Sequence, residues 1–100
     1  MDIRKTIKGN TITLEIAGEL DATTVAELRP ELNAIADDHP ERVEVDLRGL
    51  RMVDSSGVGA IISLFKRFRA NGNAFVVSGV TGQPLSIFRV LRLDKVFEIQ

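Results

Sequence analysis

The four consecutive residues Asp54-Ser55-Ser56-Gly57 are the part of the sequence that points most directly to chemistry. They precede a segment with helical apolar spacing, which places them at a predicted helix N-terminus. Asp and Ser are typical caps there, because their side-chain oxygens accept hydrogen bonds from unpaired backbone N–H groups. A phosphate on a serine at this position would be stabilised by the same N–H groups and by the helix dipole. It would add about −1.5 to −2 charges, which Asp54 would partly repel.

Two interpretations of this segment stand side by side. In the structural one, Asp54 or Ser55 only caps the helix, and Gly57 and Gly59 allow the helix to pack closely on a sheet. In the functional one, the serine is a modification site whose charge is read by a partner. The same two interpretations apply to Asp21, which lies at the start of an earlier predicted helix. It either caps that helix or forms a second part of the functional surface.

Several classes of site are disfavoured by composition. The chain has no Cys, which removes disulfides and thiolate metal sites, and the single His39 disfavours a His-based metal cluster or a Ser-His-Asp triad. It has no Trp or Tyr to stack on single-stranded nucleic acid, and its net charge of −1 gives no bias toward nucleic acid or membranes. No apolar run approaches the roughly 18–20 residues of a membrane span, and no apolar leader core is present. We therefore expect a cytoplasmic protein.

Known catalytic motifs are also missing. No Gly-Lys pair exists for a Walker-type phosphate loop, and no Gly-x-Ser-x-Gly nucleophile elbow is present. Gly57-Val58-Gly59 begins like a dinucleotide loop, but Ile62 stands where a third glycine is needed. Asp46 and Asp54 are the nearest candidates for paired catalytic acids, and spacing alone leaves that option open. We predict a substrate and ligand of enzymes, with no catalytic residues, metal or cofactor of its own.

Charge is unevenly divided along the chain. Residues 1–50 carry 6 basic and 11 acidic groups, whereas residues 51–100 carry 7 basic and 3 acidic groups. Internal charge pairing would account for this, and so would a polarised surface that orients a protein partner. The cluster Lys66-Arg67-Arg69 has the same two interpretations, as a solvated helix end or as part of a docking face for an acidic surface.

The periodicity of apolar residues predicts the elements that hold this segment. Alternation predicts strands at 3–8, 11–16, 43–47 and near 96–99, and a continuous apolar run predicts a buried strand at 74–77. Helical spacing predicts helices over 25–35, 58–68 and 85–91, with a kink or early break at Pro30. Gly9-Asn10 suits a tight hairpin turn.

This order predicts a single α/β domain over residues 1–100. We expect a mostly parallel or mixed sheet of about four to five strands with an antiparallel N-terminal edge hairpin. About three to four helices should pack mainly on one face, because the clean alternation of two strands indicates that part of the other face is solvated.

Three segments resemble one family. VDSSGVGAIISLFKRFRANG (53–72), the upstream GELDATTV (18–25) and VLRLDKVFEI (90–99) together resemble the STAS domain, and more closely the stand-alone bacterial anti-sigma factor antagonists. The resemblance covers essentially the whole chain in order. Either of the first two blocks alone would be a weak signal, but their combination is specific.

The resemblance implies a partner-switching mechanism. An anti-sigma factor that is also a serine kinase of the GHKL type would phosphorylate Ser55, with Ser56 as a minor acceptor. The unphosphorylated chain would bind that kinase and release its target, and a PP2C-type phosphatase would reset it. We expect a monomer, because one exposed interface would be used transiently. Asp21, Asp54 and Gly57 would complete the partner-binding loop.

Two alternatives belong to other functional classes. STAS domains also regulate transporters, so the chain could be a soluble subunit bound to a permease. A nucleotide-sensing module is the other alternative, although no basic residue lies between Val53 and Leu64 to hold a phosphate tightly.

Overall fold

The computed structural model describes residues 1–100 and contains a six-stranded mixed sheet. Five strands are hydrogen-bonded in the order β1-β2-β3-β5-β6, and β4 pairs with β2 outside this path. All neighbouring strands are parallel except β1 and β2. The strands are β1 (Asp2–Lys8), β2 (Thr11–Leu20), β3 (Arg42–Asp46), β4 (Leu50–Val53), β5 (Ala74–Ser78) and β6 (Glu98–Ile99).

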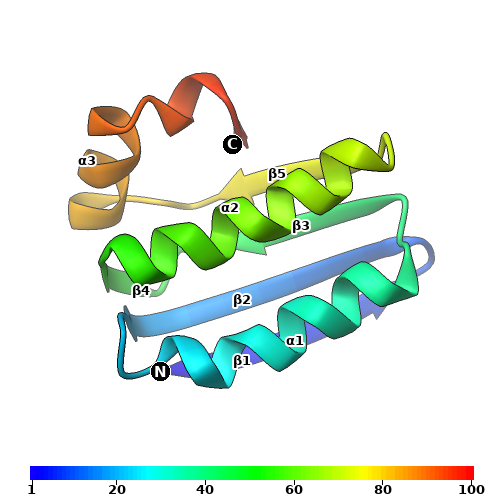
Figure 1. Ribbon diagram of the computed structural model, residues 1–100, viewed down its shortest axis with the longest axis horizontal. Coiled ribbons are helices and arrows are strands. Elements are labelled where there is room, and N and C mark those ends of the chain that lie inside the picture. The colour runs from blue at the N-terminus through cyan, green and yellow to red at the C-terminus, as the bar shows by residue number, and fades with distance from the viewer.

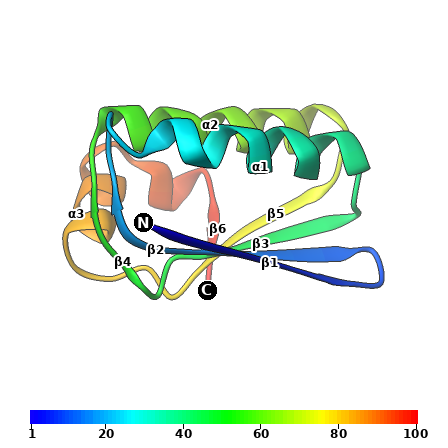
Figure 2. The same cartoon turned by 90° about the horizontal axis from the view of Figure 1, so that it is seen from below.

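The helices cover one face of the sheet. They are α1 (Val25–Asp38), α2 (Ser55–Ala70) and α3 (Gly82–Val90), with a short 3-10 turn, η1 (Leu93–Lys95). Figure 1 shows α3 at the end of the sheet where α2 begins, and Figure 2 shows α1 and α2 side by side above a bare opposite face. None of the helices is both long and apolar enough to span a bilayer. The predicted α/β fold class is confirmed.

The N-terminal hairpin follows the sequence pattern closely. Lys8 pairs with Thr11 across the Gly9-Asn10 turn, and Gly9 has a φ of 62°, which glycine adopts without strain. Ile12, Leu14 and Ile16 of β2 are buried beneath the helices. The residues between them face the uncovered side of the sheet and are polar, as alternation predicts.

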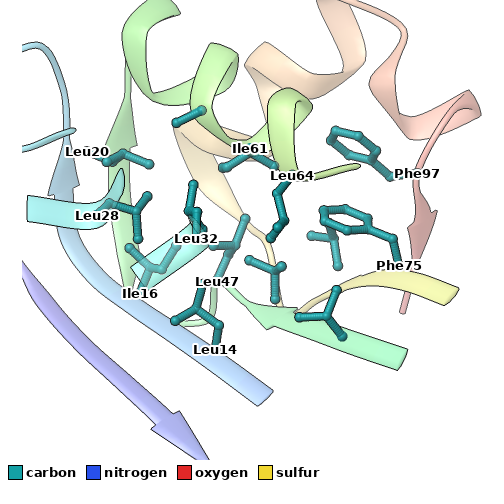
Figure 3. Close-up of a cluster of buried hydrophobic side chains, with 14 of the residues drawn as sticks. Leu14, Ile16, Leu20, Leu28, Leu32, Leu47, Ile61, Leu64, Phe75 and Phe97 are labelled. Carbon is teal, nitrogen blue, oxygen red and sulfur yellow. The ribbon is translucent and has the colours of Figure 1, made fainter. Parts of the chain in front are cut away.

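A single apolar core lies between the sheet and the helices. It comprises 24 buried residues from the strands, the helices and the C-terminal segment, and Figure 3 shows a part of it. Phe65, Phe75 and Phe97 pack with ring centroids 5.1 to 5.5 Å apart, in edge-to-face or tilted arrangements. These aromatic contacts attach the C-terminal segment to α2 and β5.

The strand β4 is absent from the sequence-based prediction, which placed no strand between the one at 43–47 and the helix over 58–68. Leu50 and Val53 are buried but the two residues between them are exposed, so the strand shows no alternation. The parallel pairing of β2 with β4 is also irregular, with a register shift between Gly18 and Glu19. Such an irregularity breaks the period of two on which strand prediction depends.

The helix α1 continues through Pro30, so of the kink or early break predicted there the early break does not occur. Pro30 lies within the helix and is exposed. Leu28 precedes it, Leu32 and Ile35 follow it, and all three are buried. Packing of both halves on the same sheet outweighs the lost hydrogen bond of the proline.

The basic cluster at the end of α2 is partly structural. The Arg67 guanidinium lies 3.2 Å from the Asp37 carboxylate and donates to the Asn33 side-chain oxygen at 3.0 Å, joining α2 to α1. Lys66 and Arg69 are exposed, and for them the docking interpretation stays a prediction.

Candidate functional site

The residues Asp54–Gly57, predicted to form a phosphorylation switch, lie at the start of α2. Asp54 is the N-cap in extended conformation, and its Oδ1 accepts a hydrogen bond from the Gly57 N–H at 3.1 Å. Ser55 is the first helical residue and is exposed, whereas Ser56 is half-buried and Gly57 is buried. Asp54 therefore caps the helix as predicted, which leaves its role at a partner surface a prediction, and Ser55 is the more accessible of the two serines.

The Asp54 carboxylate also holds a second loop. Its Oδ2 accepts a hydrogen bond from the Ala22 N–H at 3.1 Å, across 32 residues of sequence. The Asp54 N–H itself donates to the Leu20 carbonyl at 3.2 Å. One side chain thus joins the β2–α1 loop to the start of α2 and brings Asp21 and Ser55 to the same end of the sheet.

Asp21 caps the turn that leads into α1. Its Oδ1 accepts hydrogen bonds from the Thr23 hydroxyl at 2.6 Å, the Thr23 N–H at 2.9 Å and the Thr24 N–H at 3.2 Å. Its carbonyl accepts from the Val25 N–H at 2.9 Å. Hydrogen bonds from the Thr23 hydroxyl first, and then from the Thr23 N–H, lower the pKa of Asp21 below its ordinary value of 3.8.

The lowered pKa gives a prediction that tests this turn. Since the folded state favours the ionised carboxylate, the stability that Asp21 contributes is present above its unfolded pKa and is lost as pH falls through its folded pKa. In Thr23→Val, the Asp21 pKa should rise, because the hydroxyl donor is removed while the backbone donors remain. Carboxyl carbon NMR titration measures this directly. Thr23→Ser keeps the hydroxyl and should leave the pKa low, and a Thr23→Val titration identical to wild type would contradict the assignment.

Gly57 and Gly59, the two glycines in the first turns of α2, have different surroundings. A Cβ at Gly57 would lie 2.7 Å from side-chain carbons of Leu20 and Val53 and 2.8 Å from the Leu20 carbonyl oxygen. Gly57 therefore permits the close packing predicted from the sequence. Gly59 is exposed and a Cβ there would meet nothing within 4 Å, so the same expectation is wrong for Gly59.

Sequence reasoning missed Gln83, which supports the segment from α3. The Gln83 Oε1 accepts from the Val53 N–H at 2.9 Å, and its Nε2 donates to the Val53 carbonyl at 2.9 Å. No local sequence signal marks this residue, since its partner lies 30 positions away.

The surface beside the segment is shallow and acidic. A depression of about 100 Å³ is lined by Glu19, Leu20, Asp21, Met52, Val53 and Asp54. Its lining includes three carboxylates and neither Lys nor Arg, so it offers no cation to a bound phosphate. No group of three or more His, Cys, Asp or Glu side chains stands together in a way that could hold a metal ion. The site can present a serine hydroxyl to another protein.

The chain belongs to the STAS domain family. The family model described as "Mlab, STAS domain" matches residues 3–99, essentially the whole chain. The resemblance stated from the sequence is thereby confirmed at the level of the family.

Relatives with described roles agree with this assignment. The chain is similar to an anti-sigma-B factor antagonist of Staphylococcus aureus, with 24% identity over 99% of this chain and 92% of the relative. An anti-sigma factor antagonist from Mycobacterium paratuberculosis has the same fold, with a TM-score of 0.90 and 18% identity over 98% of this chain and 83% of that one. The phosphorylated form of the Bacillus cell fate determinant SpoIIAA matches with a TM-score of 0.79 and 17% identity, over 99% and 91% of the two chains.

Proposed function

We propose that this protein is an anti-sigma factor antagonist that works by partner switching in the cytoplasm. The unphosphorylated chain binds an anti-sigma factor and thereby releases the factor's target, and phosphorylation of Ser55 ends that binding. The chain is a ligand and substrate in this scheme and not an enzyme. The full-length similarity to a named anti-sigma-B factor antagonist supports the general role.

One observation carries the choice of Ser55. Ser55 is the exposed first residue of α2, directly after a capping carboxylate that fixes the backbone around it. Its hydroxyl is therefore presented on a defined surface. A hydroxyl in a disordered segment would also be reachable by a kinase, but its charge would not alter a preformed contact surface.

Electrostatics explains how one phosphate could act as a switch. The neighbouring depression already carries the carboxylates of Glu19, Asp21 and Asp54, and no basic side chain lines it. A phosphate adds about −1.5 to −2 charges. Because no cation of the depression is placed to pair with it, the added charge stays available to repel or mismatch a partner surface. The fold need not change.

Two other proteins complete the scheme. The anti-sigma factor is itself a serine kinase of the GHKL type, and the second protein is a PP2C-type phosphatase. The kinase supplies the phosphate and the phosphatase removes it, so Ser55 occupancy reports the balance of the two activities. Ser56 is a minor acceptor in this scheme, because it is less exposed than Ser55.

Phosphopeptide mapping of the protein from its own cells tests the proposal. Trypsin cuts after Arg51 and Lys66, and the peptide between them contains Ser55, Ser56 and Ser63. Fragmentation must therefore localise the phosphate. We expect phosphate on Ser55 with an occupancy that differs between growth and stress. Peptide recovered in good yield without phosphate on Ser55 under any condition would overturn the switch.

A further inference from the structure

The backbone N–H and C=O of Val53 lie on the side of β4 that has no neighbouring strand. The strand β4 pairs with β2 on one side only, and the Asp54 N–H points toward β2, where it donates to the Leu20 carbonyl. Successive residues of a strand direct their polar groups to opposite sides, so the N–H and C=O of Val53 face away from β2. Val53 is 2% exposed, and both groups therefore need partners within the protein.

Gln83 supplies both partners with one side chain. Its amide accepts from the Val53 N–H and donates to the Val53 carbonyl, each at 2.9 Å. A primary amide carries the same donor and acceptor as a peptide group, so Gln83 takes the place of one residue of an adjacent strand. It is the second residue of α3 and is followed by the buried Pro84, which anchors its backbone.

We propose that Gln83 is a positioning residue for the segment Asp54–Gly57. Val53 immediately precedes Asp54, whose carboxylate holds the N–H groups of Gly57 and Ala22. If the Val53 peptide lost its partners, it would turn toward water and carry Asp54 away from both donors. Through Gln83, α3 therefore determines how Ser55 is presented. The link to Ser55 rests on the proposed function, whereas the positioning itself does not.

Amide hydrogen exchange on the unphosphorylated full chain tests the positioning. Gln83→Met keeps the side-chain length and removes both hydrogen bonds. Protection at the Ala22 and Gly57 amides should fall roughly tenfold or more, because two hydrogen bonds no longer oppose local opening. Protection at the Val45 and Val77 amides, in β3 and β5, should stay within about twofold of wild type.

The matched control is Gln100→Met, the same substitution at the exposed C-terminal residue. It should leave protection at Ala22 and Gly57 unchanged. Unchanged protection in Gln83→Met would overturn the proposal. An equal loss at all four amides would also overturn it, since that result describes general destabilisation without positioning.

A binding measurement tests the link to the switch. The probe is a protein captured from an extract of the cells in which this chain naturally occurs. It is the protein that binds the unphosphorylatable Ser55→Ala chain and does not bind Ser55→Asp. Gln83→Met should bind it roughly tenfold more weakly than wild type does, and Gln100→Met should bind equally well. Selective loss of protection with unchanged affinity would overturn the link to Ser55. If no protein is captured in this Ser55-dependent way, the proposed function fails, and hydrogen exchange still decides the role of Gln83.

Discussion

Ser55→Asp is expected to weaken binding to the anti-sigma factor by more than a hundredfold. Ser55 is exposed at the start of α2, where a partner would contact a neutral hydroxyl. Enclosing a carboxylate in that contact without a pairing cation costs about 3 kcal/mol of binding free energy, which is more than two orders of magnitude in Kd. The depression beside Ser55 adds no cation to offset this cost.

Titration calorimetry with the captured partner measures the effect. Ser55→Ala should bind as tightly as the unphosphorylated wild type and stay active under all conditions. Ser86→Asp places the same charge on an exposed serine of α3 and separates a local effect from a change of net charge. Equal affinities for wild type, Ser55→Ala and Ser55→Asp would contradict partner switching at this residue. All variants should show the same far-ultraviolet circular dichroism, because the substitutions are at exposed positions.

The substitution Gly57→Ala is expected to destabilise the fold by about 2 kcal/mol. An added methyl group would lie 2.7 to 2.8 Å from three atoms of Leu20 and Val53, and one of these atoms is a backbone oxygen that cannot rotate away. Overpacking of this kind costs about 1–3 kcal/mol, and three contacts this short place Gly57→Ala at the upper end of that range. The higher helix propensity of alanine returns about 1 kcal/mol at most. Since α2 must move away from β2 and β4, the clash should dominate.

Thermal and urea denaturation measure this effect, with a decrease in Tm of about 10 °C. Gly59→Ala is the matched control, because it makes the same substitution two residues further along the same helix in open space. It should stabilise the protein by about 0.5–1 kcal/mol, through helix propensity and a less flexible unfolded chain. Similar changes of Tm and unfolding free energy in both variants would show that the close approach of Gly57 to Leu20 and Val53 is not the cause.

Features that depend on neighbours in sequence could be predicted from the residues alone. The cap at Asp54 requires only an acceptor three residues before the Gly57 N–H, and the Gly9-Asn10 hairpin requires only turn residues between two alternating stretches. The α/β class followed from the periodicity of apolar residues, and Ser55 followed from its place at a predicted helix start together with the family resemblance.

Features that depend on distant residues were not predictable in this way. Gln83 carries no pattern that pairs it with Val53, and nothing near Asp54 indicates that its second oxygen holds Ala22. The two glycines at 57 and 59 look alike in sequence, yet only one of them faces the strands. The continuity of α1 through Pro30 likewise depends on a sheet that buries both halves of the helix.

The residues alone were therefore enough to predict the three helices, five of the six strands and the chemical types at the candidate site, whereas β4 was missed. Local hydrogen bonding and apolar periodicity act over only a few residues, which is why they can be read from one segment at a time. Which of these residues come into contact depends on the packing of segments that lie far apart in the chain. The β2–α1 loop, the end of β4 and the start of α3 converge on Asp54 and Val53 because the parallel strands β2 and β4 carry their carboxyl ends to one edge of the sheet.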